Sequence, residues 1–241
     1  IVNFGGVGVV DREGLYSGER QFFCNGRRLQ GRKTGPLGKQ VKQETLPMKI
    51  VSAGNGASVL AGGDNHHHFK TSPLIGTAQP IRIWAIGDFG KANNEQIQVR
   101  QSFIDYSQGK HTDVWIWLGD NAYQDGTDAE YQAKVFDPTY GYDSLFRFLP
   151  FMPCPGNHDY KSVNLLTNDG PYYQNFSLPE NGEAGGRPSG EAGYYSFDYG
   201  NVHLISLNSE YVIWFLTSSS KMVDWLKKDL QQNDKDFTIV Y

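Results

Sequence analysis

Three stretches of this sequence repeat one pattern, in which a short apolar run ends in a glycine that is followed by a polar side chain. They read IRIWAIGDFG at 81–90, VWIWLGDNAY at 114–123 and FMPCPGNHD at 151–159. Runs of β-branched and aromatic residues predict strands, and wholly apolar runs are typical of strands buried on both faces of a sheet. Residues 93–106 have apolar side chains at helical spacing, so the order strand–helix–strand predicts a layered α/β fold.

The polar turns after these three strands carry candidate metal ligands. Asp88 lies in the first turn, Asp120 in the second, and Asn157, His158 and Asp159 in the third. Ligands bind beyond the carboxyl ends of strands in α/β sheets, and these ends meet if the strands are neighbours. A single Gly-Asp turn is ordinary turn chemistry, but three such turns together favour a metal site. Oxygen-rich donors with some nitrogen suit iron, manganese or zinc.

The same residues resemble the motifs of calcineurin-like metallophosphoesterases and, more narrowly, of purple acid phosphatases. The general superfamily opens with Asp-x-His, but Gly90 stands where that histidine would be. Purple acid phosphatases have a tyrosine three residues after the bridging aspartate, and Tyr123 stands there. The resemblance covers roughly residues 57–241. It implies an α/β fold with a layered β-sandwich flanked by helices, incomplete at the C-terminus, and it leaves the N-terminal segment unassigned.

The resemblance implies a binuclear site with one ferric ion and one divalent ion, which is zinc, iron or manganese. Asp88 and Tyr123 would bind the ferric ion, because phenolate is a hard anionic donor. Asp120 would bridge both ions, and Asn157 would bind the divalent ion through its amide oxygen. His158 would lie beside the substrate phosphate and help to protonate the leaving group.

The family's reaction would make the protein an acid phosphatase that acts on small phosphate monoesters through a metal-bound hydroxide. Asp159 stands where glutamate is common in the family, and we expect it to orient His158. Two alternatives remain open. One is a phosphodiesterase or nucleotidase with the same site, and the other is a truncated, non-catalytic binding module.

The family completes its site with a downstream histidine and then a Gly-His-x-His turn. Neither occurs in this sequence, which ends inside the apolar run Phe237–Tyr241. The resemblance therefore implies an amino-terminal portion of a phosphatase that is weak or inactive alone.

The chain has 241 residues, and its charge is unevenly distributed. Residues 1–50 carry nine Lys and Arg against four Asp and Glu, a net charge of +5, and the rest carry 13 against 22, a net charge of −9. The basic segment has no interleaved aromatic residues or binding motif, so we expect a solvated arm and not a nucleic-acid site. We expect an unassigned segment at 1–50, a possible β-sandwich remnant and linker at 51–77, and the metallophosphoesterase domain at 78–241.

Several further features bear on structure and on the cell compartment. No apolar run approaches the roughly 18 residues of a membrane helix, and no signal peptide opens the chain. The family resemblance and the sequon at Asn175 favour a secreted glycoprotein. We expect Cys154 to be a buried thiol, His203 to be structural, and Asp198 to be a turn residue. The oligomeric state does not follow from the sequence.

The remaining expectations concern secondary structure and core. We predict short helices at 129–136 and 143–149, a helix at 218–232 and a strand at 237–241. We also predict hairpins at 57–70 and 194–207. The three adjacent histidines, His66, His67 and His68, are typical of an exposed edge strand. We predict that three tryptophans lie in the core: Trp84, Trp115 and Trp117.

Overall fold

The computed structural model describes residues 20–24, 27–31, 43, 45–47, 49–51, 59–62, 64, 66–164, 167–210 and 216–241. The first part of this range holds six short strands: β1 (Arg20–Cys24), β2 (Arg27–Gly31), β3 (Thr45–Pro47), β4 (Lys49–Val51), β5 (Val59–Gly62) and β6 (His68–Lys70). They pair as β1–β2, β3–β6 and β4–β5, all antiparallel. The hairpin predicted at 57–70 is therefore wrong, because its two strands, β5 and β6, each pair with an upstream strand.

The first large sheet holds the three apolar runs as parallel neighbours. Its strands are β7 (Ile83–Ile86), β8 (Val114–Leu118) and β9 (Phe151–Cys154), with β8 in the centre. The register runs from Ile83 opposite Val114 on one side, and from Trp115 opposite Phe151 on the other. This confirms the expectation that the three carboxyl ends lie at one edge.

Helices connect these strands. Helix α1 (Asn94–Ser107) begins where the Asn93 side chain accepts a hydrogen bond from the backbone N–H of Gln96, as a cap does. After β8 come α2 (Asp128–Glu130), the π-helical segment η1 (Tyr131–Phe136) and α3 (Asp143–Phe146), and after β9 come α4 (Asn157–Tyr160) and α5 (Pro171–Asn175). None of the helices in the described part of the chain is long and apolar enough to cross a membrane.

The second large sheet follows as a hairpin and a returning strand. Strands β10 (Tyr195–Tyr199) and β11 (Val202–Ser206) are antiparallel, and β12 (Phe237–Val240) lies parallel to β11. Helix α7 (Leu216–Gln232) makes the crossover between β11 and β12 and begins two residues before its predicted start. The hairpin and the last strand are thus confirmed.

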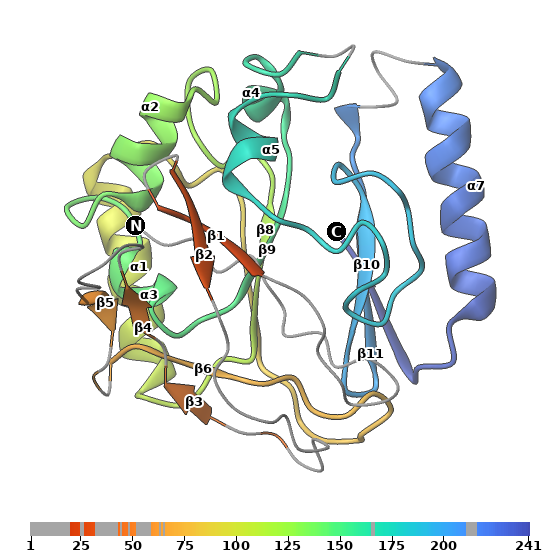
Figure 1. Ribbon diagram of the computed structural model, residues 1–241, viewed down its shortest axis with the longest axis horizontal. Coiled ribbons are helices and arrows are strands. Elements are labelled where there is room, and N and C mark those ends of the chain that lie inside the picture. The colour runs from red at the N-terminus through yellow and green to blue at the C-terminus, as the bar shows by residue number, and fades with distance from the viewer. Residues whose placement is uncertain are drawn as a thin grey trace.

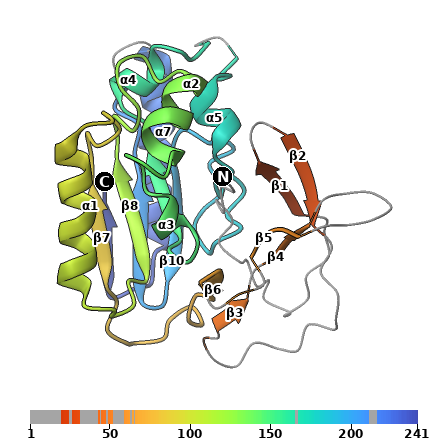
Figure 2. The same ribbon diagram turned by 90° about the vertical axis from the view of Figure 1, so that its left-hand side faces the viewer.

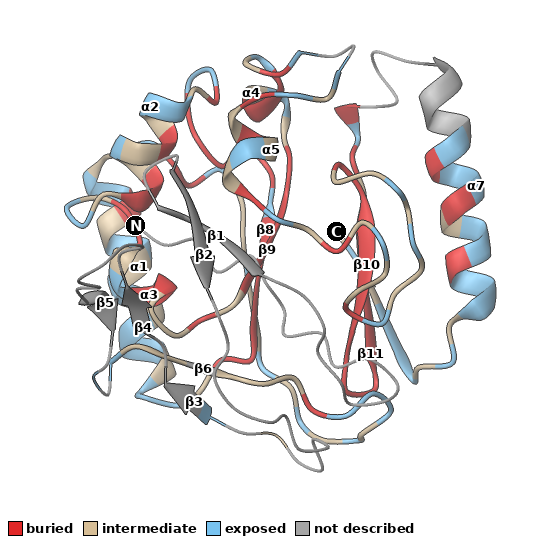
Figure 3. Cartoon of the chain, in the orientation of Figure 1, coloured by how far each residue is buried: buried red, intermediate tan, exposed pale blue. Residues whose placement is uncertain are grey.

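Side chains that alternate along β8 define the layers. Val114 and Ile116 pack with residues of β10 and β11, so the two sheets lie face to face. Trp115 and Trp117 point the other way, into a cluster with residues of η1 and α3. Helix α7 covers the outer face of the second sheet, where Trp225 packs on Ile205. Figure 1 shows the resulting order of helices, sheet, sheet and helix, and Figure 2 views the same layers from the side of α1 and α3. Figure 3 shows β10 and β11 as buried strands between the first sheet and α7.

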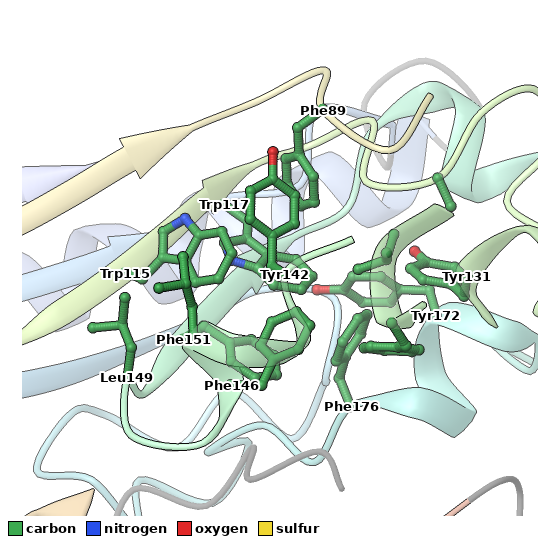
Figure 4. Close-up of a cluster of buried hydrophobic side chains, with 14 residues drawn as sticks. Phe89, Trp115, Trp117, Tyr131, Tyr142, Phe146, Leu149, Phe151, Tyr172 and Phe176 are labelled. Carbon is green, nitrogen blue, oxygen red and sulfur yellow. The ribbon is translucent and has the colours of Figure 1, made fainter. Parts of the chain in front are cut away.

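Aromatic rings fill the space between the first sheet and its helices (Figure 4). Trp115 and Trp117 are fully buried, and Trp84 is partly buried against them. The Trp117 ring stacks on Phe151 with centroids 4.6 Å apart, and Trp84 stacks on Trp115 at 4.4 Å. The three tryptophans are core residues, as the sequence predicts, and they fix the strands that lead into the polar turns. Cys154 is likewise a buried free thiol.

Candidate metal centre

The turns after β7, β8 and β9 are joined to one another by the backbone. The N–H of Asp88 donates to the carbonyl of Gly119 at 3.1 Å, which ties the first turn to the second. A Cβ atom on Gly156 would lie 2.2 Å from the backbone nitrogen of Asp120, so the third turn approaches the second too closely for any side chain there. Both aspartates have left-handed backbone conformations, with φ of 58° at Asp88 and 53° at Asp120. Such conformations are uncommon outside glycine and cluster at functional sites.

The phenol of Tyr123 contacts both aspartates. Its oxygen lies 2.9 Å from Oδ2 of Asp120 and also contacts Oδ1 of Asp88. Burial raises the pKa of Tyr123 well above its ordinary value, and the hydrogen bonds to the two carboxylates raise it further. The phenol is therefore neutral here, with one proton for two acceptors. Three oxygen atoms from two turns meet at this point.

The donor set can be tested for its fit to a metal ion. Asp88, Asp120 and Tyr123 present hard oxygen donors, which suit ferric iron or a hard divalent ion. Within the described ranges, no group of three or more His, Cys, Asp and Glu side chains is placed to hold a metal ion. The three converging oxygens are thus a partial ligand set that fits a metal ion, with a tyrosine in place of a third acidic or histidine ligand.

His158 lies against this oxygen cluster. Its backbone N–H donates to Oδ1 of Asp120 at 3.0 Å, and its ring lies over that of Tyr123 with centroids 4.3 Å apart. Its Nδ1 is 2.6 Å from the carbonyl oxygen of Gln124. Nδ1 also lies 3.1 Å from Nζ of Lys161, and both nitrogens approach this one carbonyl. Because a carbonyl only accepts, Nδ1 donates its proton to it, and Nε2, 4.0 Å from Oδ2 of Asp120, is left as a proton acceptor. The amino group of Lys161 donates to the same carbonyl at 2.9 Å.

The other two predicted residues of this turn have different surroundings. Asn157 is the first residue of α4, and its side chain is exposed. No hydrogen bond joins it to Asp88, Asp120 or Tyr123 within the part of the chain that is described, so its role as a ligand stays a prediction.

Asp159 is fully buried and links the second and third turns. It accepts hydrogen bonds from the backbone N–H and side-chain amide of Asn121, from the backbone of Gly156 at 2.8 Å, and from the Tyr131 hydroxyl at 2.5 Å. Burial raises its pKa to about 6. These bonds do not reach the ring of His158, so the expected orienting contact comes instead from the Gln124 carbonyl.

Sequence reasoning missed several residues of this region. Asn121 follows Asp120 directly, so the Gly-Asp-Asn turn itself carried a signal for it. Tyr131 and Lys91 gave no such signal, because they approach through the fold. The Lys91 amino group lies 4.5 Å from the centroid of the Tyr123 ring, where a cation is attracted to the ring face.

Two curated proteins are similar to this chain in sequence. Purple acid phosphatase 15 of Arabidopsis thaliana is 27% identical over 192 residues, which are 71% of this chain and 34% of that protein. Human acid phosphatase type 7 is 31% identical over 161 residues, 64% of this chain and 32% of that protein. The chain therefore spans about a third of the length of the curated relatives it matches.

A solved structure and a family model complete the comparison. The structure of a purple acid phosphatase from yellow lupin (Lupinus luteus) seeds has a TM-score of 0.48 and 21% identity, and covers 72% of this chain and 32% of that one. The sequence model described as calcineurin-like phosphoesterase matches residues 81–241. Because that match covers more than half of the sequence, the chain belongs to the calcineurin-like phosphoesterase family.

Proposed function

We propose that the protein is a metal-dependent acid phosphatase that hydrolyses small phosphate monoesters. The observation that carries the proposal is the phenol of Tyr123, which contacts the carboxylates of Asp88 and Asp120 at the edge where three parallel strands end. The names of the relatives, purple acid phosphatase and acid phosphatase, agree with it. Secretion, glycosylation at Asn175 and the division of the chain at residues 50 and 77 stay predictions.

The roles we propose follow from the donors. Asp88 and Tyr123 would hold a ferric ion, Asp120 would lie between it and a divalent ion, and Asn157 would serve the divalent ion. When bound, such a pair of ions supplies an activated water and stabilises charge on the phosphate oxygens. With its Nδ1 proton held by the Gln124 carbonyl, His158 can take up a second proton at Nε2 and, as imidazolium, deliver that proton toward the leaving group.

Substitution of Tyr123 by Phe tests the ferric assignment. We expect the iron-loaded protein to show a visible tyrosinate band that Tyr123→Phe abolishes, because no other proposed ligand is a phenol. Release of phosphate from an aryl monoester should fall by at least about 10-fold, the usual cost of disturbing a metal site. The control is Tyr106→Phe, since Tyr106 is 86% exposed on α1 and should leave both readouts unchanged. A colourless iron-loaded wild-type protein would falsify the ferric assignment, and a preference for diesters would overturn the monoester one.

A further inference from the structure

An ion pair next to the candidate metal centre has no role in the proposed chemistry. Glu130 ends α2 and Lys134 lies one helical turn later, in η1, with Nζ 3.0 Å from Oε1. Both side chains are half-buried, at 18% and 25% exposure. An acidic residue four positions before a basic one is the favourable order for a helical pair, but such a pair alone contributes only about 0.3–0.5 kcal/mol. The other hydrogen bonds of the two side chains, to the backbone of residues 123–125, indicate a further role.

The two side chains bind both polar groups, the carbonyl and the N–H, of the peptide between Tyr123 and Gln124. Lys134 Nζ donates to the carbonyl oxygen of Tyr123, and Glu130 Oε1 accepts from the N–H of Gln124. The second carboxylate oxygen of Glu130 accepts from the N–H of Asp125 at 2.9 Å. The peptide between Tyr123 and Gln124 is therefore fixed by a charge at each end.

The residues on the two sides of that peptide reach different parts of the candidate centre. Tyr123 directs its phenol to Asp88 and Asp120, and Gln124 directs its carbonyl to Nδ1 of His158. A shift of this one peptide would move a proposed ligand and the proposed proton donor together. Misplacement by about 1 Å can cost a hundredfold in rate.

We propose that Glu130 and Lys134 are positioning residues that keep the phenol of Tyr123 and the imidazole of His158 in fixed relation. The inference rests on the proposed function, because that function gives the phenol and the imidazole their roles. The hydrogen bonds of Glu130 and Lys134 to the peptide do not depend on bound metal. Neither residue touches the oxygen cluster, so neither is a catalytic residue.

A purely structural explanation also exists and supplies the control. Thr127 caps α2: its hydroxyl accepts from the N–H of Glu130 at 3.3 Å, and Glu130 accepts from the N–H of Thr127 at 3.1 Å. Thr127→Ala removes this cap at a cost of about 1 kcal/mol. It also removes the hydrogen bond from the Thr127 hydroxyl to Oε2 of Glu130 at 3.1 Å, but it removes neither partner of the bonds of Glu130 to Gln124 and of Lys134 to Tyr123. Capping explains Glu130 but gives no reason for Lys134 to reach the Tyr123 carbonyl.

The test compares Lys134→Met, Lys134→Arg, Glu130→Gln and Thr127→Ala in the whole chain without metal, by imidazole 15N NMR of histidine-labelled protein. In the wild type we expect His158 to be held as the Nδ1–H tautomer. In Lys134→Met and Glu130→Gln both of its nitrogen shifts should move toward the average of the two tautomers. Lys134→Arg should restore the wild-type shifts, and Thr127→Ala should keep them while the melting temperature falls.

Two results would overturn the inference: wild-type His158 shifts in folded Lys134→Met and Glu130→Gln, or equal changes in Thr127→Ala. Glu130→Gln nearly keeps the size of the side chain, so it decides the matter if Lys134→Met fails to fold. If the protein hydrolyses an aryl phosphate, kcat of Lys134→Met should fall about 100-fold with little change in KM. A colourless iron-loaded wild-type protein would contradict the proposed ferric site, while the NMR result, which needs neither metal nor turnover, still judges the positioning role.

Discussion

Gly90 shows how one residue constrains the site. A Cβ atom at this position would lie 1.9 Å from the carbonyl oxygen of Asn121 and 3.0 Å from Cα of Ala122. The N–H of Tyr123 donates to the carbonyl of Gly90 at 2.9 Å, so the first and second turns are bound together here. No side chain fits at residue 90, which means that a histidine ligand at this position is excluded by the backbone of the neighbouring turn. The ligand role passes to Tyr123 in our proposal.

Gly90→Ala should therefore be costly. The added methyl group must push the two turns apart, and overpacking of this kind costs about 1–3 kcal/mol. The control is Gly109→Ala, because Gly109 has φ of +70° with nothing within 4 Å of its Cβ position, so only the left-handed conformation is penalised. Urea unfolding of both variants measures the difference. A Gly90→Ala protein as stable as the wild type would show that the turns separate freely.

Positions in the site could be predicted from the sequence, but most contacts could not. The apolar runs locate Asp88, Asp120 and His158 because strand ends and polar turns are local features. The link between Glu130 and Gln124, or between Tyr131 and Asp159, depends on how a turn of several residues folds back, and local patterns do not encode that.

At the scale of elements, a buried histidine fastens α7 to the second sheet. His203 on β11 contacts Asp198 of β10 through Nδ1 at 2.7 Å and Asp229 of α7 through Nε2 at 2.8 Å. Lys235, after α7, approaches the other oxygen of Asp198 at 3.4 Å. His203 is structural, as the sequence suggested. Asp198 is a buried strand residue, so its prediction as a turn residue is wrong.

The charge on His203 gives this attachment a pH dependence. Burial opposes the charge, but the hydrogen bonds to Asp198 and Asp229 outweigh it and raise the pKa from 6.5 to about 9. Because the folded pKa lies above the unfolded one, the stabilisation is complete below about pH 6.5 and is lost as the pH rises through 9. Urea unfolding at pH 6, 8 and 10 should show this decline.

His203→Gln should lower the free energy of unfolding by about 3 kcal/mol at pH 6, because it leaves the buried Asp229 without its cation. It should also flatten the decline between pH 8 and 10. His67→Gln is the matched control, since His67 pairs with the exposed Asp64 and should cost less than about 1 kcal/mol. An unchanged pH profile in His203→Gln would show that other groups control it.

The sequence predicts those strands and helices whose apolar residues recur at a regular spacing. The alternation of Val114 and Ile116 with the two tryptophans is that of a strand buried on both faces, and β8 has both faces covered. The helix predicted at 93–106 is confirmed as α1, but its expected apolar face is wrong, because Val99, Ile104 and Tyr106 are exposed. Pairing fails for β5 and β6, because partners distant in sequence leave no local trace.

At the scale of the whole molecule, two sheets face each other between helices, and the candidate centre lies at the end of the first sheet (Figure 1). Two carboxylates gather around one phenol there, and the nearby amino group of Lys91 lies over the ring face of Tyr123. Negative oxygens that share one proton repel each other when it leaves. A bound cation would relieve this repulsion and tie the turns after β7 and β8 together.

Metal binding should therefore raise the stability of the entire chain. A ligand that binds only the folded state at 100 times its dissociation constant adds about 2.7 kcal/mol, which for a protein of this size is about 5–10 °C in melting temperature. Differential scanning fluorimetry with ferric iron and zinc, against EDTA, measures the shift. Asp120→Asn should remove most of it, because Asp120 is the proposed ligand of both ions. Asp143→Asn, which breaks the Asp143–Arg147 pair on α3, should retain it. An equal shift in Asp120→Asn would place the bound metal elsewhere on the molecule.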